Sequence, residues 1–520
     1  MDDPAGTAFL AVGGVIVAWD VVVAGQVGRT HLGAEWFRWI SALAGLLIVP
    51  AVVVAVADGS LLTARITSGI AWLWPLTLAM FAAQAIGAVA ARLVAPAIAL
   101  PVVAWNVTLA LVAAGRLHAD GGGEPPTWLA TLGAAQAHAL GVAIGDRALT
   151  SPWALLPPLM APVYPARWRG RVAVRVVVAL VAAVGVGAMG QALRPAGAAL
   201  RSYAHYAAQP LQERPLGDFA IGVRILPTVR DAPGPHALRM DLGLVDSIGA
   251  RAVLVVVDPR ARGPVLDSLA RALDPYRRDS VAVIVAIDNV PRAHGIAADD
   301  RDALRDRLAF VDQLARRVRP QYLLPEPPDG DDDGRSLDTR QELLARAAVM
   351  AHAVSGRIRI GLSLRPAVAA DSALYVWATT GDSPVDAIGF AIATGFGGAA
   401  TIDAQLTTAA RWMRAATAGR REHWVWAATT APVAHGNTNQ AHALRGLLAW
   451  ATSHPAVNGL IVFSAGDYDE RTGLRSASGR LRPAVEMLTR AVDGLSDTRA
   501  APVPAPAAVV VPVPPRAPPR

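Results

Sequence analysis

Hydrophobic and polar positions divide the chain into two halves of different character. In the first half, six apolar runs approach the roughly 20 residues that a helix needs to span a bilayer. They cover residues 7–27, 37–57, 66–89, 97–114, 128–144 and 172–193. The fifth run contains Gln136 and His138, and a further run at 152–163 is short and broken by proline. The pattern predicts a bundle of about six transmembrane helices, within a range of five to seven.

The second half alternates short apolar runs with amphipathic stretches. Strands are predicted at 220–226, 252–257, 281–287, 321–324, 358–364, 387–392, 424–427 and 459–463. Helices are predicted at 236–248, 265–273, 301–318, 340–354, 372–378, 402–416, 440–453 and 482–491. Eight strand–helix pairs match the size and order of a (β/α)8 TIM barrel, and continuous apolar strands are typical of a parallel sheet buried on both faces. An open doubly wound sheet is the alternative, but no glycine-rich first turn supports it.

Composition reinforces this division. The chain is 53% hydrophobic with a mean hydropathy of +0.36, and residues 1–200 contain only eight of the 41 acidic residues. We therefore expect a transmembrane domain at 1–193, a linker at 194–217 and a barrel at 218–495. Residues 496–520 are almost entirely Ala, Pro, Val and Arg, a composition that predicts a disordered, extended tail.

Two residue types are absent, which excludes several chemistries. All 48 basic residues are Arg, so neither a Schiff-base lysine nor a P-loop lysine exists. Without Cys there is no disulfide, thiolate nucleophile or Cys-ligated metal. The net charge of +7 is spread along the chain, and we expect no nucleic-acid partner.

The distribution of Arg predicts the orientation in the membrane. Arg29, Arg38 and Arg92 lie in or beside loops at one end of the predicted bundle, and four more Arg follow the fifth run. Such loops are expected to face the cytoplasm. The N-terminus and the barrel then lie outside the cytoplasmic (inner) membrane of a bacterium, in the periplasm or beyond it, with the lipid bilayer as an obligatory partner.

Asp20 lies well inside the first predicted span. A carboxyl group at this depth is costly and often marks a functional site, such as a coupling group in transport. The alternative is a structural role, with the carboxyl protonated or bonded to another helix through Asn106 or Gln84.

The predicted strands end in polar residues, as expected at the mouth of a barrel enzyme. Glu326 follows the fourth strand and stands between two prolines. The other strand ends carry Asp258, Asp288, Arg365 and Asp467. Carboxylates with an Arg suit a neutral, hydroxyl-rich ligand such as a carbohydrate, and Trp426 and Tyr468 are candidates to stack on sugar rings. Core packing is the alternative for each aromatic residue.

The last third of the chain resembles a known family. Residues 423–432 read His-Trp-Val-Trp-Ala-Ala-Thr-Thr-Ala-Pro, and they are followed by Gly436-Asn437, Asn439-Gln440 and Leu447-Leu448-Ala449-Trp450. Residues 459–463, Asp467-Tyr468-Asp469 and the run at 479–484 continue the pattern. This order resembles clan A glycoside hydrolases, and in particular family 17 glucanase-like proteins.

The resemblance implies a retaining mechanism with two glutamates. Glu326 matches the acid/base that ends strand four, with Pro325 where Asn is usual. The nucleophile that should end strand seven falls on Ala428. A retaining glycosidase needs two carboxyl groups about 5–5.5 Å apart, so this substitution predicts impaired catalysis. Asp467 is the alternative second carboxylate, in an inverting arrangement.

An acidic run follows Glu326 closely. Asp329, Asp331 and Asp333 fit the first half of a calcium loop, although Arg340 stands where its bidentate Glu is usual. The alternative is a solvated acidic loop. No other cofactor is expected.

Three hypotheses remain. The favoured one is a membrane-anchored barrel that binds β-glucan or a related exopolysaccharide without turnover, in company with exopolysaccharide synthesis or export proteins. The second is an active hydrolase or transglycosylase that uses Glu326 with an atypical carboxylate. The third is a transport component in which the membrane helices do the work and the barrel is accessory.

Overall fold

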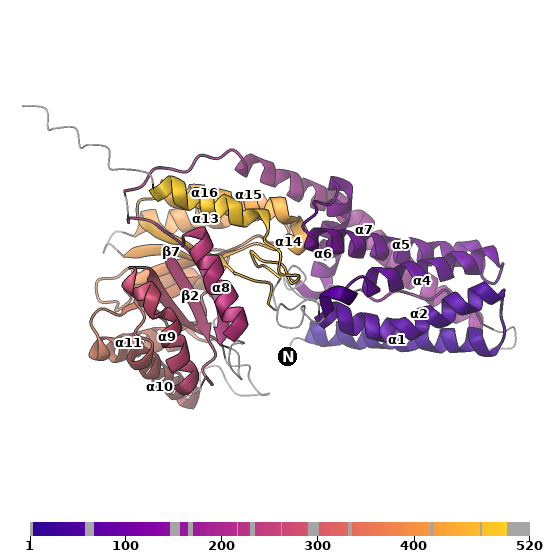
Figure 1. The fold of residues 1–520 in the computed structure, drawn as a ribbon, viewed down its shortest axis with the longest axis horizontal. Coiled ribbons are helices and arrows are strands. Elements are labelled where there is room, and N and C mark those ends of the chain that lie inside the picture. The colour runs from indigo at the N-terminus through magenta and orange to yellow at the C-terminus, as the bar shows by residue number, and fades with distance from the viewer. Residues whose placement is uncertain are drawn as a thin grey trace, which may run out of the picture.

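A computed structural model describes residues 4–496 except 58–66, 146–155, 165–169, 216, 229–234, 262, 290–300, 331–334, 417–420 and 469–470. The predicted tail and the positions of Asp331 and Asp333 therefore lie outside the described residues. Within them, a bundle of long helices lies beside a barrel of parallel strands (Figure 1).

The second half of the chain is a closed eight-stranded barrel in the order β1 to β8, with every neighbouring pair parallel. Its strands are β1 Ala220–Thr228, β2 Ala252–Val257, β3 Ala282–Ile287, β4 Tyr322–Leu324, β5 Arg359–Leu364, β6 Ala387–Ala393, β7 Glu422–Thr429 and β8 Val457–Phe463. The predicted TIM barrel is thereby confirmed. The open-sheet alternative is wrong, because β1 pairs with β8 as well as with β2.

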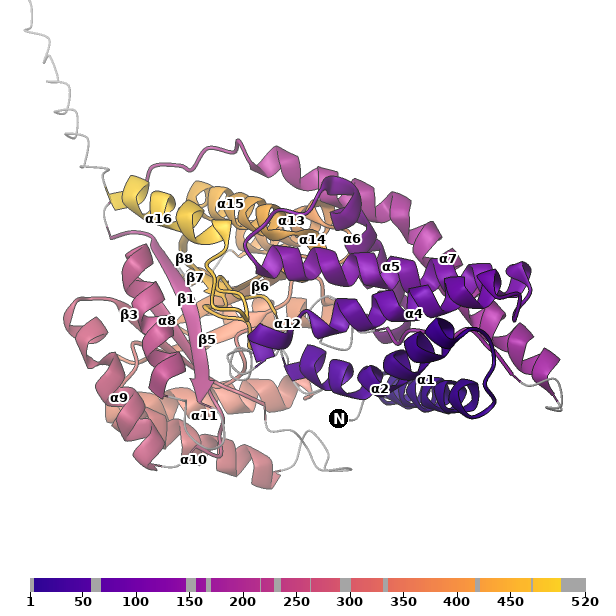
Figure 2. The same cartoon turned by 45° about the vertical axis from the view of Figure 1, so that its right-hand side comes forward.

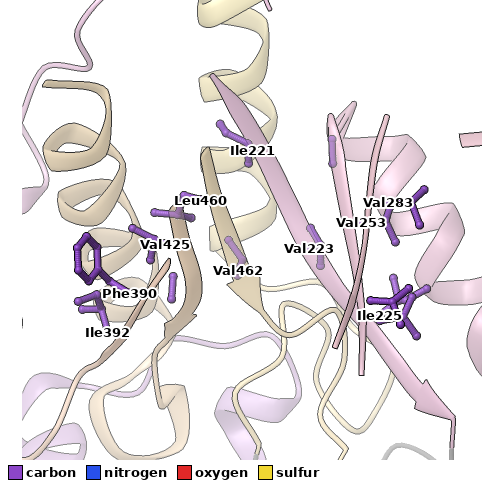
Figure 3. Close-up of a cluster of buried hydrophobic side chains, with 14 of the residues drawn as sticks. Ile221, Val223, Ile225, Val253, Val283, Phe390, Ile392, Val425, Leu460 and Val462 are labelled. Carbon is purple, nitrogen blue, oxygen red and sulfur yellow. The ribbon is translucent and has the colours of Figure 1, made fainter. Parts of the chain in front are cut away.

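Helices alternate with the strands around the barrel. They are α8 Pro235–Ile248, α9 Gly263–Arg278, α10 Arg301–Arg317, α11 Leu337–Val354, α12 Ala369–Ala378, α13 Ala399–Ala415, α14 Pro432–His435, α15 Asn437–Ser453 and α16 Pro483–Ser496. Outward strand residues such as Val253, Val283 and Val425 pack against these helices, and together they form the largest apolar core (Figure 3). Burying this apolar layer is the main force that holds the barrel together.

The barrel interior is a second, separate core built around aromatic side chains. Trp424 and Trp426 stack with ring centroids 4.8 Å apart, and Tyr322 meets both rings edge-on. Gly389 on β6 leaves the space that Trp426 fills, since a Cβ there would lie 1.6 Å from Trp426 Cδ1. The interior is therefore packed, as in other barrels of this type.

The described residues of the first half form a bundle with six long helices, α1 Pro4–Arg29, α2 Glu35–Ala57, α4 Leu73–Ala90, α5 Pro96–Asp120, α6 Thr127–Ile144 and α7 Arg171–Ser202. Five of them are long and apolar enough to cross a membrane, and α6 does not belong to that group. The outlier is the predicted span that contains Gln136 and His138, whose polar side chains lower its hydropathy. Helix α7 runs on beyond 193, through much of the predicted linker, and is followed by a short helix η4, Tyr203–Tyr206.

Residues 156–164 form a non-helical segment inside this bundle. Leu159, Met160 and Ala161 are almost completely buried among the helices. The Asn106 side chain accepts from the Leu159 N–H at 3.0 Å and donates to its carbonyl at 2.7 Å. The Gln84 side chain binds Ala161 in the same way: it accepts from the Ala161 N–H at 2.9 Å and donates to the Ala161 carbonyl at 3.3 Å. Irregular backbone at membrane depth requires such partners because lipid offers none.

Asp20 binds the backbone of Met160, which lies between Leu159 and Ala161. Its Oδ1 accepts from the Met160 N–H at 2.8 Å, and the side chain is fully buried. The link to Asn106 and Gln84 is thus indirect, since all three side chains hold the same segment. One oxygen of the Asp20 carboxyl is therefore hydrogen-bonded to the backbone of this buried segment.

The bundle and the barrel are joined by more than the covalent linker (Figure 2). Tyr206 donates to Asp403 Oδ1 of α13 at 2.6 Å, and Asn437 of α15 donates to the Ala119 carbonyl at the end of α5 at 3.3 Å. Phe396, in the loop after β6, packs edge-on against His138 of α6. The loops after β6, β7 and β8 therefore meet the helices of the bundle, so this side of the barrel mouth faces the bundle.

The barrel touches the ends of α2 and α5 that lie away from the Arg-rich loops. Arg471, in the loop after β8, donates to the Ala55 carbonyl near the end of α2, whereas Arg38 lies at the start of that helix. Arg92 lies just before α5, whose last residue contacts the barrel. This arrangement agrees with the predicted separation of the barrel from the Arg-rich loops, while the identity of each side stays a prediction.

Candidate functional site

Glu326 follows β4 at the carboxyl ends of the strands, but its carboxylate is already engaged. Arg340 of α11 donates to both carboxylate oxygens at 3.0–3.2 Å, and Arg335 lies 3.7 Å away. Glu326 and Arg340 are each only 3% exposed. A carboxylate whose two oxygens accept from a buried guanidinium is poorly placed to protonate a leaving group.

The same guanidinium reaches a second buried carboxylate. Arg340 donates to Asp371 Oδ1 of α12 at 3.0 Å, and the Arg365 backbone N–H donates to Asp371 Oδ2 at 2.7 Å. Asp371 is fully buried. Glu326, Arg340 and Asp371 thus form a buried ion-pair network, which we call the Glu326 network, and it ties β4 to helices α11 and α12.

Asp467, the alternative second carboxylate, is held in a comparable way. Arg482 donates to its two oxygens at 2.8 and 2.6 Å, and the Gly473 N–H donates to Oδ1 at 2.8 Å. Both side chains are buried. This bidentate ion pair holds the loop after β8 together, so both oxygens of Asp467 are already engaged within the protein.

Strand β7 has a bulge that changes which residue faces the mouth. Its register with β6 and with β8 shifts between Val425 and Ala428, and Trp426 and Ala427 both belong to the interior core. Ala428 packs in the outer core against the helices. Because side chains alternate along a strand, Thr429 follows Ala427 on the interior face. Ala428, where the resemblance predicts a nucleophile, therefore points away from the mouth, and none of the described residues 428–437 carries a carboxylate.

Polar side chains from β1, β2 and β3 gather on another part of the mouth. Arg224 of β1 lies over the Phe463 ring of β8, with its guanidinium carbon 3.9 Å from the centroid. Burial raises the pKa of Asp288, and the neighbouring charge of Asp258 raises it further, while Arg224 opposes the shift. Asp258 accepts from Arg260 at 3.1 Å and is mostly buried. These residues, Arg224, Asp258, Asp288 and Phe463, are called the mouth cluster below.

The two candidate sugar-stacking residues lie elsewhere. Trp426 is fully buried in the barrel interior, so it offers no free face to a ligand. Tyr468 is 7% exposed and donates its hydroxyl to Asp241 of α8, which also accepts from Arg475 at 2.6 Å. Burial and the Asp241 carboxylate raise the pKa of Tyr468. For both rings, the structure favours the core-packing alternative.

Arg365 and the acidic run complete the predicted set. Arg365 is partly exposed, with its Nε 3.7 Å from Asp371, so it borders the Glu326 network. Asp329 belongs to the turn after Glu326, whereas Asp331 and Asp333 lie outside the described residues. Among the residues that the structure does describe, no group of three His, Cys, Asp or Glu side chains could hold a metal ion.

No family model matches the sequence, and no curated protein matches it. Solved structures that align with the chain are glycoside hydrolases. They include a beta-glucuronidase from an uncultured Clostridium sp., at 10% identity over 52% of this chain and 50% of that one, with a TM-score of 0.39. This chain thus spans about half the length of that enzyme.

Two further alignments have similar values. A GH5_18 protein from Bifidobacterium longum, in complex with Manb1-4GlcNAc, aligns at 10% identity over 54% of this chain and 79% of that one, with a TM-score of 0.42. Saccharomyces cerevisiae Gas2p, in complex with laminaritetraose and laminaripentaose, aligns at 11% identity over 54% and 64%, with a TM-score of 0.39. At such identities the likeness is one of fold alone.

Sequence reasoning missed the residues that decide the state of the carboxylates. Arg340 and Asp371 lie 14 and 45 positions beyond Glu326, on separate helices, and no local motif joins them. Arg224 lies inside the apolar run 220–226, whose pattern predicts a buried strand and gives no sign of a functional residue. The one usable signal was Arg inside the predicted helices and strands, where a charge needs a partner.

Proposed function

We propose that this protein is a membrane-anchored, non-hydrolytic glycan-binding protein. Its barrel lies outside the cytoplasmic membrane of a bacterium and binds β-glucan or a related exopolysaccharide, alongside proteins of exopolysaccharide synthesis or export. The bilayer holds the helical bundle, and the bundle holds the barrel at the surface.

The observation that carries the absence of hydrolysis is the engagement of Glu326 by Arg340. Glycoside hydrolysis needs one carboxyl group that gives a proton and a second that attacks or activates water. Here Glu326 and Asp467 are each bound by a buried guanidinium. Strand β7 contributes Thr429, whose hydroxyl would need a positioned base to act as a nucleophile.

Support for glycan binding comes from the mouth cluster. Asp288 carries hydrogen-bond acceptors for sugar hydroxyls and Arg224 carries donors, whereas Arg260 already binds both oxygens of Asp258. Phe463 is 3% exposed and lies beneath that guanidinium, so its ring supports Arg224 and is not itself a stacking surface. A mixed set of acceptors and donors beside a ring suits a neutral polyol better than a charged ligand.

Titration of the full-length protein in detergent with a soluble β-glucan tests the proposal. We expect saturable binding, no release of reducing ends, and at least tenfold weaker binding in Asp288→Asn. Asp312→Asn, on the far side of α10 in a surface pair with Arg316, is the matched control and should bind as wild type does. Reducing ends released by wild type and lost in Glu326→Gln would instead establish a hydrolase.

One observation favours transport as a second candidate. The non-helical segment 156–164 is buried among the helices of the bundle, and transporters place substrate sites at such breaks in helical structure. Solute flux through proteoliposomes would support transport if Asp20→Asn abolished it. Flux equal to that of empty vesicles would remove this candidate.

A further inference from the structure

The junction between the bundle and the barrel contains two adjoining cavities, of about 60 and 50 Å³. Three charged residues line both of them, namely Arg116 and Asp120 of α5 and Arg471 from the loop after β8. Gln136 of α6 lines the first cavity and Arg482 lines the second. The bundle and the barrel thus both contribute cations to the same two small cavities.

The two arginines have hydrogen-bonding capacity left over. Arg116 donates to Gln136 Oε1 at 3.3 Å, and Arg471 donates to the Ala55 carbonyl at 3.3 Å. The Nε of each guanidinium is buried and has no hydrogen-bond partner among the described residues. A buried guanidinium N–H without an acceptor is costly, so a bound acceptor would stabilise this arrangement.

The charges in the junction are unbalanced. Arg482 is matched by Asp467. Arg482 also lies 4.0 Å from Asp120, so among the described charged groups Arg116, Arg471 and Arg482 face Asp120 and Asp467, which leaves one excess positive charge. Arg116 and Arg471 are also close enough to repel each other electrostatically. An anion between them would relieve that repulsion.

The remaining wall of the first cavity is apolar. Trp74, Leu78 and Leu109 line it from helices α4 and α5, both of which can span a membrane. A cationic end and an apolar wall together match an anionic head group with a hydrocarbon chain. Guanidinium groups bind phosphoryl oxygens well because their N–H donors are fixed in a fork.

We propose that this junction binds a phosphoryl group, carried by a lipid or free in solution, through Arg116 and Arg471. Because the two arginines belong to different domains, the bound phosphoryl group also fixes the barrel on the bundle. The proposal is independent of glycan binding, which uses the mouth cluster. The alternative is that Arg471 only caps the end of α2 by donating to the Ala55 carbonyl; in that case the cavities bind no ligand.

Thermal unfolding of the full-length protein in a neutral detergent tests the site. The probes are dioleoyl phosphatidic acid, inorganic phosphate and dioleoylglycerol, the last carrying the chains without the phosphoryl group. We expect saturable stabilisation by phosphatidic acid and none by dioleoylglycerol. The apparent Kd should rise at least tenfold, about 1.4 kcal/mol, in Arg116→Gln and in Arg471→Gln. Arg480→Gln, on the same loop but outside both cavities, should leave it unchanged.

The two sources give different results. Stabilisation by phosphatidic acid alone identifies a lipid, and saturable stabilisation by inorganic phosphate identifies a site that takes the free ion. If neither probe stabilises wild type, the proposal is wrong. It is equally wrong if both Gln variants fold and respond as wild type does. Should Arg471→Gln fail to fold, Arg116→Gln and Arg471→Lys decide, the latter retaining the charge and part of the binding.

Discussion

The Glu326 network predicts that Glu326 supports the fold and does not serve catalysis. Glu326→Gln keeps the shape of the side chain and removes its charge. Arg340, which is 3% exposed, then faces an amide in place of a carboxylate. Breaking a buried ion pair by removing one partner costs about 3–5 kcal/mol. Asp371 still pairs with Arg340, so we expect the lower end, about 3 kcal/mol, for Glu326→Gln and the upper end for Arg340→Met.

The assay is thermal or urea unfolding of the full-length protein in detergent, followed by Trp fluorescence. For a domain of this size, 3 kcal/mol corresponds to a fall in Tm on the order of 10 °C. Glu342→Gln is the matched control, because it lies on the same helix in a surface pair with Arg346 in which both side chains are 53% exposed. A surface pair contributes at most about 1 kcal/mol, so this variant should unfold close to wild type.

The opposite result would refute the reasoning. Catalytic carboxylates are usually held in strained or destabilised surroundings, and their removal often leaves a protein as stable as before or more so. A Glu326→Gln variant with an unchanged or higher Tm would show that the Arg340 pair is not required for the fold. An acid role for Glu326 would then regain support.

Three other predictions concern the barrel and the bundle. Burial lowers the pKa of His423 to about 4, against about 6.5 in the unfolded chain, so its stabilising contribution is complete above pH 6.5 and is lost as the pH falls toward 4. At pH 5 the loss is about 2 kcal/mol, and urea melts at pH 7 and pH 5 should show a smaller difference for His423→Gln than for wild type. Gly389→Ala places a methyl group on Trp426 and should cost about 1–3 kcal/mol by thermal unfolding, with partial rescue by Trp426→Phe; an unchanged Tm would contradict the packing described. Asp20→Ala should lose about 1–3 kcal/mol because the Met160 N–H loses its acceptor, whereas Asp20→Asn keeps an acceptor and should unfold near wild type; equal losses in both would point to the charge itself.

Local patterns predicted the barrel well because each strand is a short apolar run between polar turns. The observed strand β2 has the predicted limits, and the others differ by one or a few residues at their ends. The bundle was predicted from length and hydropathy in the same way. Its fifth helix was the exception, since α6 packs against α7 and the barrel and is less apolar than a lipid-facing span.

The candidate site was predicted less well. The resemblance places the nucleophile position on Ala428, but the bulge in β7 turns this residue outward, and a bulge leaves no reliable mark in a single sequence. Tyr468 and Trp426 were candidates to stack on sugars, with core packing as the alternative, and both side chains are buried in the structure.

The sequence by itself determined the two halves of the chain, the repeating strand–helix order and the position of Glu326 at the end of strand four. Those features depend on periodicity and composition, which are local properties. Only the tertiary structure decided which group binds Glu326, because Arg340 reaches it from helix α11 while Asp371 of α12 binds the same guanidinium. It also decided the role of Asp20, since the Met160 N–H that it accepts from lies 140 residues away. A charge acquires its function from its partners, and the partners are set by the fold.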